Sequence, residues 1–240
     1  MAAGSGRWRR PEAPVREVVR VFESDPDLLA DVPAGRAERL VLVGAPALRA
    51  EPGAWSPPCA EGARHLGFLV VDGLLVRTVR LAPHGMPELV GPGDLIRPDE
   101  HVRDDLGLAA ADGWEVLEPA RLAELDDYFA ERVADAPEVL ARLLERTSDR
   151  VGRLALQAAV AHVRSAERRI LLTLWHLADR WGRVTPNGIL VPLPLTHRLL
   201  GELAALRRPT TTSAISRLSR EGRVSRTTRG HWVLHGSPPA

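Results

Sequence analysis

Seven residues between positions 140 and 161 recur at alternating steps of four and three, and this spacing constrains the fold most. They are Leu140, Leu144, Thr147, Val151, Leu154, Ala158 and Ala161. Such an alternation keeps side chains on one side of an α-helix, as along a two-stranded coiled coil. We therefore predict one long helix that presents a dimer interface. Packing of the stripe onto the helix's own domain is the alternative.

The sequence before this helix has a different pattern of apolar residues. Short apolar runs are interrupted by Gly or Pro every few residues, which is typical of an antiparallel roll or barrel. The runs at 66–71 and 74–81 flank Asp72-Gly73, a dipeptide that favours a hairpin turn. Gly91-Pro-Gly-Asp94 indicates a second tight turn, and the run that begins at Trp114 indicates a further strand.

The predicted fold class is α+β. Residues 1–14 lack periodicity and are expected to form a disordered lead, and a short helix is expected around Glu17–Leu29. An N-terminal antiparallel β-roll is predicted at 15–136, a dimerisation helix at 137–164 and a C-terminal domain at 165–240.

The C-terminal domain begins with a predicted helix and a turn into a strand. Ser165 can cap a helix that ends near Gly182. Asn187-Gly188 then favours a tight turn before the short apolar run of residues 189–193.

Residues 196–234 carry the pattern of a winged helix-turn-helix. Thr196 is a good N-cap for one short helix. Pro209 is tolerated in the first turn of a second helix, which ends at Gly222. The following residues alternate between apolar and polar around Arg229-Gly230, which predicts a β-hairpin in the position of a wing.

Charge is distributed unevenly along the chain. The formal net charge is only +1, but residues 1–136 contain 15 Arg and 24 carboxylates, whereas residues 196–240 contain eight Arg and two carboxylates. A basic module of this size suits a polyanion such as DNA. A solvated basic surface without a partner would show the same charge.

The second helix of the motif exposes Arg and hydroxyl side chains at its N-terminus. Such groups donate hydrogen bonds to phosphate, and Arg can bind guanine in the major groove. We expect Arg208 to read bases, the hydroxyls to hold phosphates and the wing arginines to contact the backbone; caps and plain surface hydroxyls are the alternative. The predicted DNA contacts are Thr196, His197, Arg207, Arg208, Thr210, Thr211, Thr212, Ser213, Arg217, Arg226 and Arg229.

Two segments resemble a known family. Val191-Pro-Leu-Pro-Leu-Thr-His-Arg-Leu-Leu-Gly-Glu-Leu and Arg207-Arg-Pro-Thr, with Leu218 and Gly222 beyond them, resemble the winged DNA-binding domain of the Crp/Fnr (cyclic-AMP receptor protein and fumarate–nitrate reductase regulator) superfamily. The resemblance covers residues 165–236, and a weaker one links residues 67–98 to the sensor roll of that family. It implies a homodimer on a palindromic operator, with RNA polymerase as a candidate partner.

The chain departs from that family at three points. The Gly-Glu pair of the family's phosphate-binding cassette is missing after Gly93-Asp94, and acidic residues crowd the region. Carboxylates repel a phosphodiester, so cyclic nucleotide is not expected as the effector. Pro209 stands where many members carry a base-reading Glu, so no operator sequence carries over. Ala205 occupies a turn position often held by Gly, which costs about 1 kcal/mol if its φ is positive.

Other classes of function find little support in the sequence. Cys59 is the single cysteine, so no intramolecular disulfide or multi-cysteine metal site can form. We find no signal peptide, no apolar run long enough for a membrane span and no phosphate-binding glycine loop. We predict a cytoplasmic protein that is not an enzyme and has no cofactor or metal.

Two functional hypotheses follow. The first is a sequence-specific, homodimeric transcription regulator that binds double-stranded DNA and has a degenerate sensor roll whose effector is unknown. The second is a ligand-binding or protein-interaction module whose winged domain contacts a protein. The basic segment 196–240 favours the first hypothesis, because it predicts salt-dependent binding to a polyanion.

Overall fold

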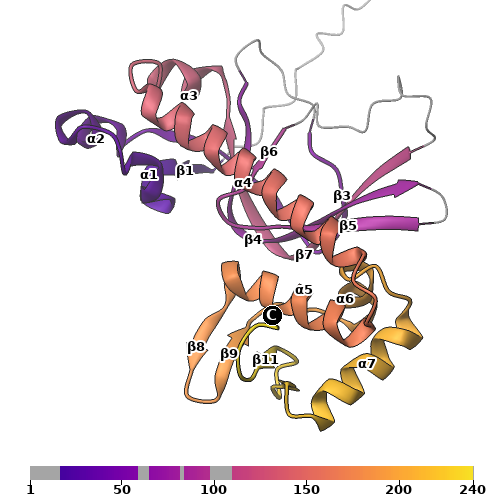
Figure 1. Ribbon diagram of the computed structural model, residues 1–240. Helices are drawn as coiled ribbons and strands as arrows, with labels where there is room; N and C mark the ends of the chain where they lie inside the picture. Colours follow the sequence, from indigo (N-terminus) through magenta and orange to yellow (C-terminus); the bar gives the residue numbers. More distant parts are fainter. Residues whose placement is uncertain (1–16, 59–64, 82–83, 98–109, 240) are drawn as a thin grey trace, which may run out of the picture.

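A computed structural model describes residues 17–58, 65–81, 84–97 and 110–239. An antiparallel sheet domain and a smaller winged domain are joined by the long helix α4 (Pro137–Ala161), which crosses the molecule diagonally in Figure 1. The α+β class is therefore confirmed, with the sheet domain first and the helix-turn-helix last. The lead predicted at 1–14 lies outside the described residues.

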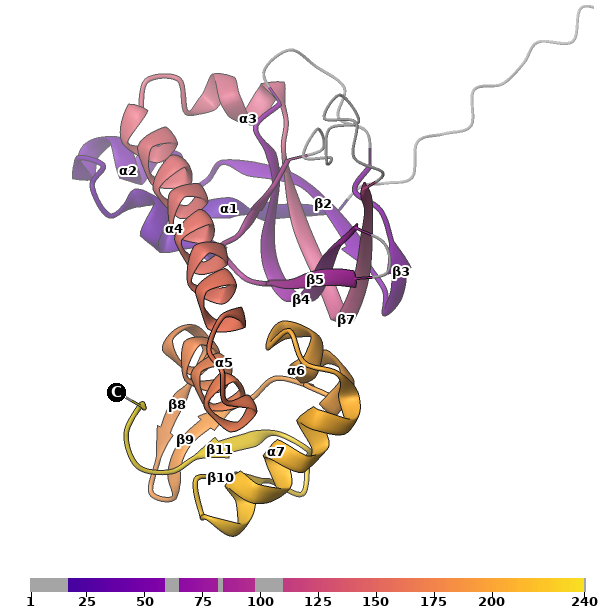
Figure 2. The ribbon, with the colours of Figure 1, turned by 45° about the vertical axis from the view of Figure 1, so that its right-hand side comes forward.

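The described residues of the N-terminal half form a sheet of seven antiparallel strands. The order along the sheet is β1-β2-β7-β4-β5, with β3 paired to β7 and β6 paired to β4. The strands are β1 (Val18–Arg20), β2 (Gly44–Ala50), β3 (Gly53–Trp55), β4 (Gly67–Leu81), β5 (His84–Val90), β6 (Leu95–Ile96) and β7 (Ala110–Leu125). In Figure 2 the strands of this sheet lie to the right of α4.

The hairpin predicted at Asp72-Gly73 is wrong, because β4 runs through these residues as one strand. It stays paired to β7, and the register shifts around Asp72 and Gly73 mark a bulge. The Asp72 carboxylate accepts hydrogen bonds from the backbone N and the Nε of Arg121, at 3.1 and 2.7 Å. Gly73 has φ +92°, and a Cβ there would lie 2.4 Å from the Cα of Ala120. The turn-forming residues thus bend a long strand.

The single helix predicted around Glu17–Leu29 is also wrong. Its residues are divided among strand β1, one helical turn α1 (Val21–Ser24) and a 3-10 turn η1 (Pro26–Leu29). Strand β1 pairs with β2, and Asp25 adopts a non-helical φ of −141° before Pro26. A proline disfavours helical backbone in the residue before it, so the helix cannot continue.

Three further helices lie in the described part of the N-terminal half. They are α2 (Ala34–Leu40), α3 (Asp127–Arg132) and α4. Helix α4 is one helix, as the spacing predicts, and it begins with Pro137 in its first turn. Its sheet-facing side buries Val139, Leu143 and Arg150. Arg150 donates to the Glu88 carboxylate on β5 at 2.8 Å and to the carbonyl oxygen of Leu95 at 3.2 Å.

The winged domain has three helices and a four-stranded antiparallel sheet of order β10-β11-β9-β8. Its elements are α5 (Ala166–Trp181), β8 (Arg183–Thr185), β9 (Gly188–Val191), α6 (His197–Leu203), α7 (Arg208–Arg220), β10 (Val224–Arg226) and β11 (Trp232–Leu234). The predicted Ser165 cap is confirmed, because its side chain accepts from the backbone N of Arg168.

One hydrophobic cluster crosses between the two domains. It joins the buried faces of α5, α6 and α7 to Leu74, Val76 and Leu89 on the outer side of the roll. Two other clusters fill the roll and the space between the roll, the N-terminal helices and α4. The winged domain therefore packs directly on the roll. Among the described residues, no helix is both long and apolar enough to span a bilayer.

We predict that Gly73→Ala destabilises the chain by about 3 kcal/mol, because a left-handed backbone and a backbone clash both oppose a Cβ there. Chemical denaturation followed by circular dichroism measures the change. Gly35→Ala is the matched control: it lies in α2 with open space around it, and the change should be neutral or slightly stabilising. Equal stability of the two variants would contradict the bulge.

Candidate nucleic-acid interface

Capping residues fix the start of both helices of the motif. The Thr196 hydroxyl accepts from the backbone N of Leu199 at 3.1 Å, which confirms it as the N-cap of α6. Helix α7 begins at Arg208, with Pro209 in its first turn, and Gly222 follows its end with φ +67°. Each helix thus starts and stops where the sequence predicts.

The two helices cross at very short range. A Cβ on Gly201 of α6 would lie 2.4 Å from the hydroxyl oxygen of Thr211 on α7, so only glycine fits there. Between the helices, Ala205 has φ +52° and is the only described non-glycine residue with positive φ. The strained turn anticipated from the sequence is present, at a cost of about 1 kcal/mol.

Thr211 is a correction to the predicted contacts. Its side chain is fully buried at this crossing, and its hydroxyl donates to the carbonyl oxygen of Arg207 at 3.1 Å. A group enclosed between two helices cannot reach DNA. The run of three threonines looks uniform in sequence, but a helix turns about 100° per residue and places the middle one inward.

The remaining residues of the first turns of α7 face solvent. Arg207, Arg208, Thr210, Thr212 and Ser213 are all exposed, and α7 contains no carboxylate. Figure 2 shows α7 at the lower edge of the molecule, on the side away from the roll. The helix therefore presents a basic, hydroxyl-bearing surface that a groove could receive.

Part of this surface is a hollow that lies between the start of α6, the start of α7 and the wing. We call it the basic hollow; its lining residues are Thr196, His197, Arg198, Arg208, Thr212 and Arg226. The Nδ1 of His197 lies 3.3 Å from the Thr212 hydroxyl. Burial, followed by the positive charges of Arg226 and Arg208, lowers the pKa of His197 below its ordinary value.

The wing is held against α6 through one arginine and one tryptophan. The guanidinium of Arg226 lies 4.8 Å from the ring centre of buried Trp232. The Nη2 of Arg226 donates to the carbonyl oxygen of Leu195 at 3.4 Å. Arg229 is exposed beside Gly230, whose φ is +81°. The wing therefore places two arginines at the surface that also carries α7.

Arg217 is exposed one turn further along α7, and it already forms an ion pair within the protein. Its Nη1 lies 2.8 Å from a carboxylate oxygen of Glu167 on α5. A DNA contact by Arg217 would have to compete with this ion pair. Sequence reasoning did not single out Arg198 or Trp232; the place of Arg198 in the first turn of α6 was an available signal for that residue.

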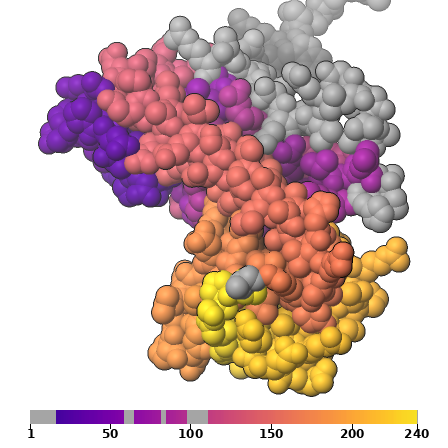
Figure 3. Space-filling model, viewed as in Figure 1, coloured from indigo at the N-terminus to yellow at the C-terminus, as the bar shows by residue number. Residues whose placement is uncertain are grey.

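The predicted dimer stripe is largely uncovered in the single chain. Leu140, Leu144 and Val151 are 40, 69 and 62% exposed. Ala158 is also exposed, whereas Thr147, Leu154 and Ala161 are half-buried. Figure 3 shows α4 running uncovered across the front of the molecule. Packing of α4 on the N-terminal domain involves Val139 and Leu143, whereas Leu140, Leu144, Val151 and Ala158 of the stripe remain exposed.

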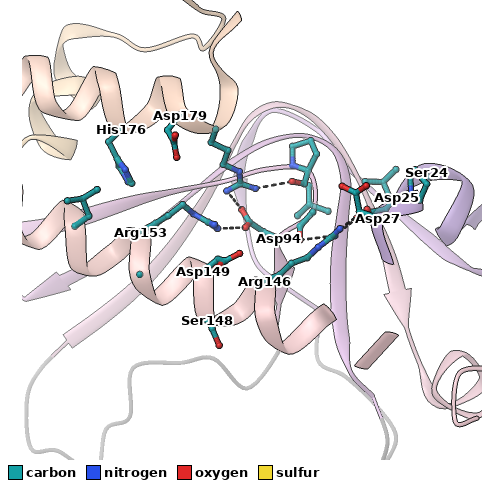
Figure 4. A pocket seen from close by; sticks show the side chains of 18 residues that line it. Ser24, Asp25, Asp27, Asp94, Arg146, Ser148, Asp149, Arg153, His176 and Asp179 are labelled. Atoms are coloured by element: carbon teal, nitrogen blue, oxygen red, sulfur yellow. Dashed lines mark hydrogen bonds and ion pairs between the residues drawn. The ribbon is translucent and has the colours of Figure 1, made fainter. Parts of the chain in front are cut away.

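A buried carboxylate links the two domains. Asp94, in the predicted turn after β5, is 3% exposed and accepts from the backbone N of Gly91 at 2.9 Å. It also accepts from Arg153 of α4 at 2.6 Å and from Arg180 of α5 at 2.7 Å. Figure 4 shows Arg153 reaching Asp94 while Arg146, on the same helix, pairs with Asp25.

Further contacts hold the same junction. Arg180 donates to the carbonyl oxygen of Pro92 at 2.9 Å, and its guanidinium lies 4.5 Å from the Trp181 ring centre. Gln157 of α4 donates to the carbonyl oxygens of Pro87 on β5 and Leu203 on α6, at 2.8 and 3.3 Å. The orientation of the winged domain on the roll is therefore set by specific polar contacts as well as by the shared apolar cluster.

The junction borders a cavity of about 860 Å³. Figure 4 shows its walls, which come from the N-terminal helices, α4 and α5. Arg146, Arg153 and Arg180 face this cavity together with Asp25 and Asp94, and each of these five is paired with another.

Comparison with known proteins identifies the winged domain. Residues 168–235 match the family model of the Crp-like helix-turn-helix domain. No curated protein sequence matches the chain.

Several solved structures share the fold over most of the chain. FixK2 from Bradyrhizobium japonicum is 18% identical, with 81% of this chain and 94% of that chain covered and a TM-score of 0.60. A cyclic nucleotide-binding domain containing protein from Listeria monocytogenes is 16% identical, with 78% and 89% covered and a TM-score of 0.61. A CRP-family transcriptional regulator from Thermus thermophilus is 23% identical, with 78% and 92% covered and a TM-score of 0.55.

We predict that Asp94→Asn destabilises the chain by about 3 kcal/mol, because it leaves two arginines without their shared carboxylate. Denaturation of the full chain measures the loss. Asp149→Asn is the control, since this exposed carboxylate lines the same cavity, and it should change stability by less than about 0.5 kcal/mol.

A double-mutant cycle with Arg180→Gln separates the link to α5 from the local turn. Because the two groups touch, their effects should not add. Strict additivity would show that Asp94 and Arg180 are not energetically coupled, and would contradict a stabilising link from Asp94 to α5.

Proposed function

The chain carries a Crp-like helix-turn-helix domain on the fold of the Crp/Fnr transcription regulators, and from this premise we propose that it binds double-stranded DNA as a homodimer and regulates transcription. The exposed, carboxylate-free surface of α7 is the observation that carries the proposal. Arg208 lies at its N-terminal end and reads base edges, while Thr196, Thr210, Thr212 and Ser213 hold phosphates.

The wing and the basic hollow add contacts to the DNA backbone. Arg226 lines the basic hollow together with Arg208, Arg229 is exposed on the wing, and Arg207 is exposed at the turn between the helices. Arginines that contact phosphates release counterions from the DNA, so binding weakens steeply as salt is added. This salt dependence distinguishes DNA binding from a winged domain that contacts a protein through apolar groups.

The stripe on α4 supports the homodimer. Leu140, Leu144 and Val151 lie along one side of the helix and are exposed in the single chain. A row of exposed leucine and valine side chains at heptad spacing is covered by a second copy of the same helix in a coiled coil. Two copies related by a twofold axis would place their α7 helices on half-sites of a palindromic operator, about 34 Å apart.

The roll is proposed to be a sensor that does not bind cyclic nucleotide. Asp94 follows Gly93 at the turn, and its carboxylate is neutralised by arginines of α4 and α5. This leaves the effector of the roll unidentified. A regulator of this kind acts in the cytoplasm, where RNA polymerase is a candidate partner.

We predict that Arg208→Ala weakens binding to a selected duplex by about 1–3 kcal/mol and relaxes selectivity at one position of each half-site. Fluorescence anisotropy with the selected duplex and with single-base variants measures both effects. Arg39→Ala, an exposed arginine on α2, removes the same charge far from the winged domain and should leave affinity nearly unchanged. Unaltered binding by Arg208→Ala would reject the base-reading role.

We predict that Leu144→Glu dissociates the dimer, because it places a charge in the middle of an apolar interface. Analytical ultracentrifugation gives the oligomeric state. Leu156→Glu is the matched control: Leu156 is 51% exposed on the same helix, but it borders the junction cavity on another side of α4. A monomeric wild type, or a Leu144→Glu variant that remains dimeric, would contradict the proposed interface.

A further inference from the structure

The basic hollow contains positive charge without a carboxylate in its lining. Arg198, Arg208 and Arg226 come from α6, α7 and the wing, and the other lining groups are two threonines and His197. Arg198 lies 3.6 Å from Glu202, whereas the guanidinium of Arg208 has no hydrogen bond or ion pair with any described residue. Three converging arginines, of which only Arg198 has a carboxylate neighbour, form a site for a monovalent oxyanion such as a phosphodiester.

His197 is the one group in this hollow that titrates near neutral pH. Its ring lies 5.9 Å from that of Trp232, centre to centre and tilted by 32°, so one face of the imidazole is covered. The charged groups facing it are Arg208 from α7, Arg226 from the wing and the neighbouring Arg198 of α6. Every charged group around the imidazole is therefore positive.

We propose that His197 is a proton-linked phosphate contact: it is neutral in the free protein and becomes the imidazolium when a DNA phosphate occupies the basic hollow. DNA should therefore bind more tightly as the pH falls. This inference rests on the proposed function, because it requires that the surface of α7 receives DNA.

The hydrogen bonds of the hollow are compatible with both protonation states. In the free protein, the Thr212 hydroxyl can donate to a neutral Nδ1 at 3.3 Å. On protonation, Nδ1–H donates to the same oxygen instead, and Nε2–H is left as a donor for phosphate. The added proton comes from solvent, and the new positive charge is balanced by the negative charge of the phosphodiester.

The direction of the pH dependence follows from the thermodynamic linkage between proton binding and DNA binding. Burial and the neighbouring arginines lower the pKa of His197 in the free chain, and a phosphate at the imidazole raises it again. Between these two values the complex holds one more proton per subunit than the free protein. The dissociation constant then falls by up to about tenfold per pH unit for each subunit bound, and it is independent of this group outside that window.

The test uses the full chain and a duplex selected by the chain itself. Affinity is measured by anisotropy from about pH 5.5 to 8, the range in which histidine titrates, at constant salt. Wild type should bind more tightly at low pH, and His197→Gln should lose this dependence while still binding the duplex. His162→Gln is the matched control, because it removes an exposed histidine just after α4, and it should behave as wild type.

A second variant keeps the test decisive if glutamine disturbs the fold. His197→Arg carries a permanent charge, so at about pH 8 it should bind as tightly as wild type does at low pH, with little pH dependence. Titration of the His197 ring protons by NMR, with and without duplex, should show a higher pKa in the complex.

The outcomes separate the two claims. Binding without pH dependence in wild type, or full pH dependence retained in His197→Gln, would overturn the proton linkage and leave DNA binding intact. Failure of wild type to bind any duplex at low salt would instead reject the proposed function.

Discussion

The close crossing of α6 and α7 determines which side of α7 faces solvent. The Thr211 side chain packs so close to Gly201 that a Cβ on residue 201 would clash with it. Ala205 adopts a left-handed backbone conformation in the turn between the two helices. With Thr211 inward, the next two residues, Thr212 and Ser213, turn toward solvent, and Arg208 is exposed at the start of the helix. The proposed DNA surface and the side of the basic hollow that α7 forms both depend on this contact.

Local sequence patterns correctly predicted those helices whose ends are determined by interactions between neighbouring residues. Thr196, Pro209 and Gly222 mark helix ends through capping and backbone preferences of single residues, and the structure has helices ending there. The spacing on α4 predicted one long helix, because its period is a property of the chain itself. The helix boundaries of the winged domain were therefore predictable from single residues, whereas the inward position of Thr211 was not.

Sequence patterns gave wrong or incomplete predictions where the conformation or contacts of a residue depend on a partner far away in the chain. Asp72-Gly73 favours a turn in isolation, but pairing with β7 along the length of β4 outweighs that preference. Asp94 was readable as a turn residue, yet its partners Arg153 and Arg180 lie 59 and 86 residues further along the chain. No local sequence pattern predicts a contact between residues so far apart. The contacts that hold the winged domain on the roll could therefore be identified only in the structure.

The central claim is that two copies of α7 enter the grooves of one duplex. Hydroxyl-radical footprinting of the full chain on a selected duplex tests it most directly, because it maps protected sugars at single-nucleotide resolution. The account predicts two protected patches on one face of the DNA, with centres about one helical turn, or roughly 34 Å, apart. A single continuous patch, or no protection under conditions where the chain is bound, would contradict it.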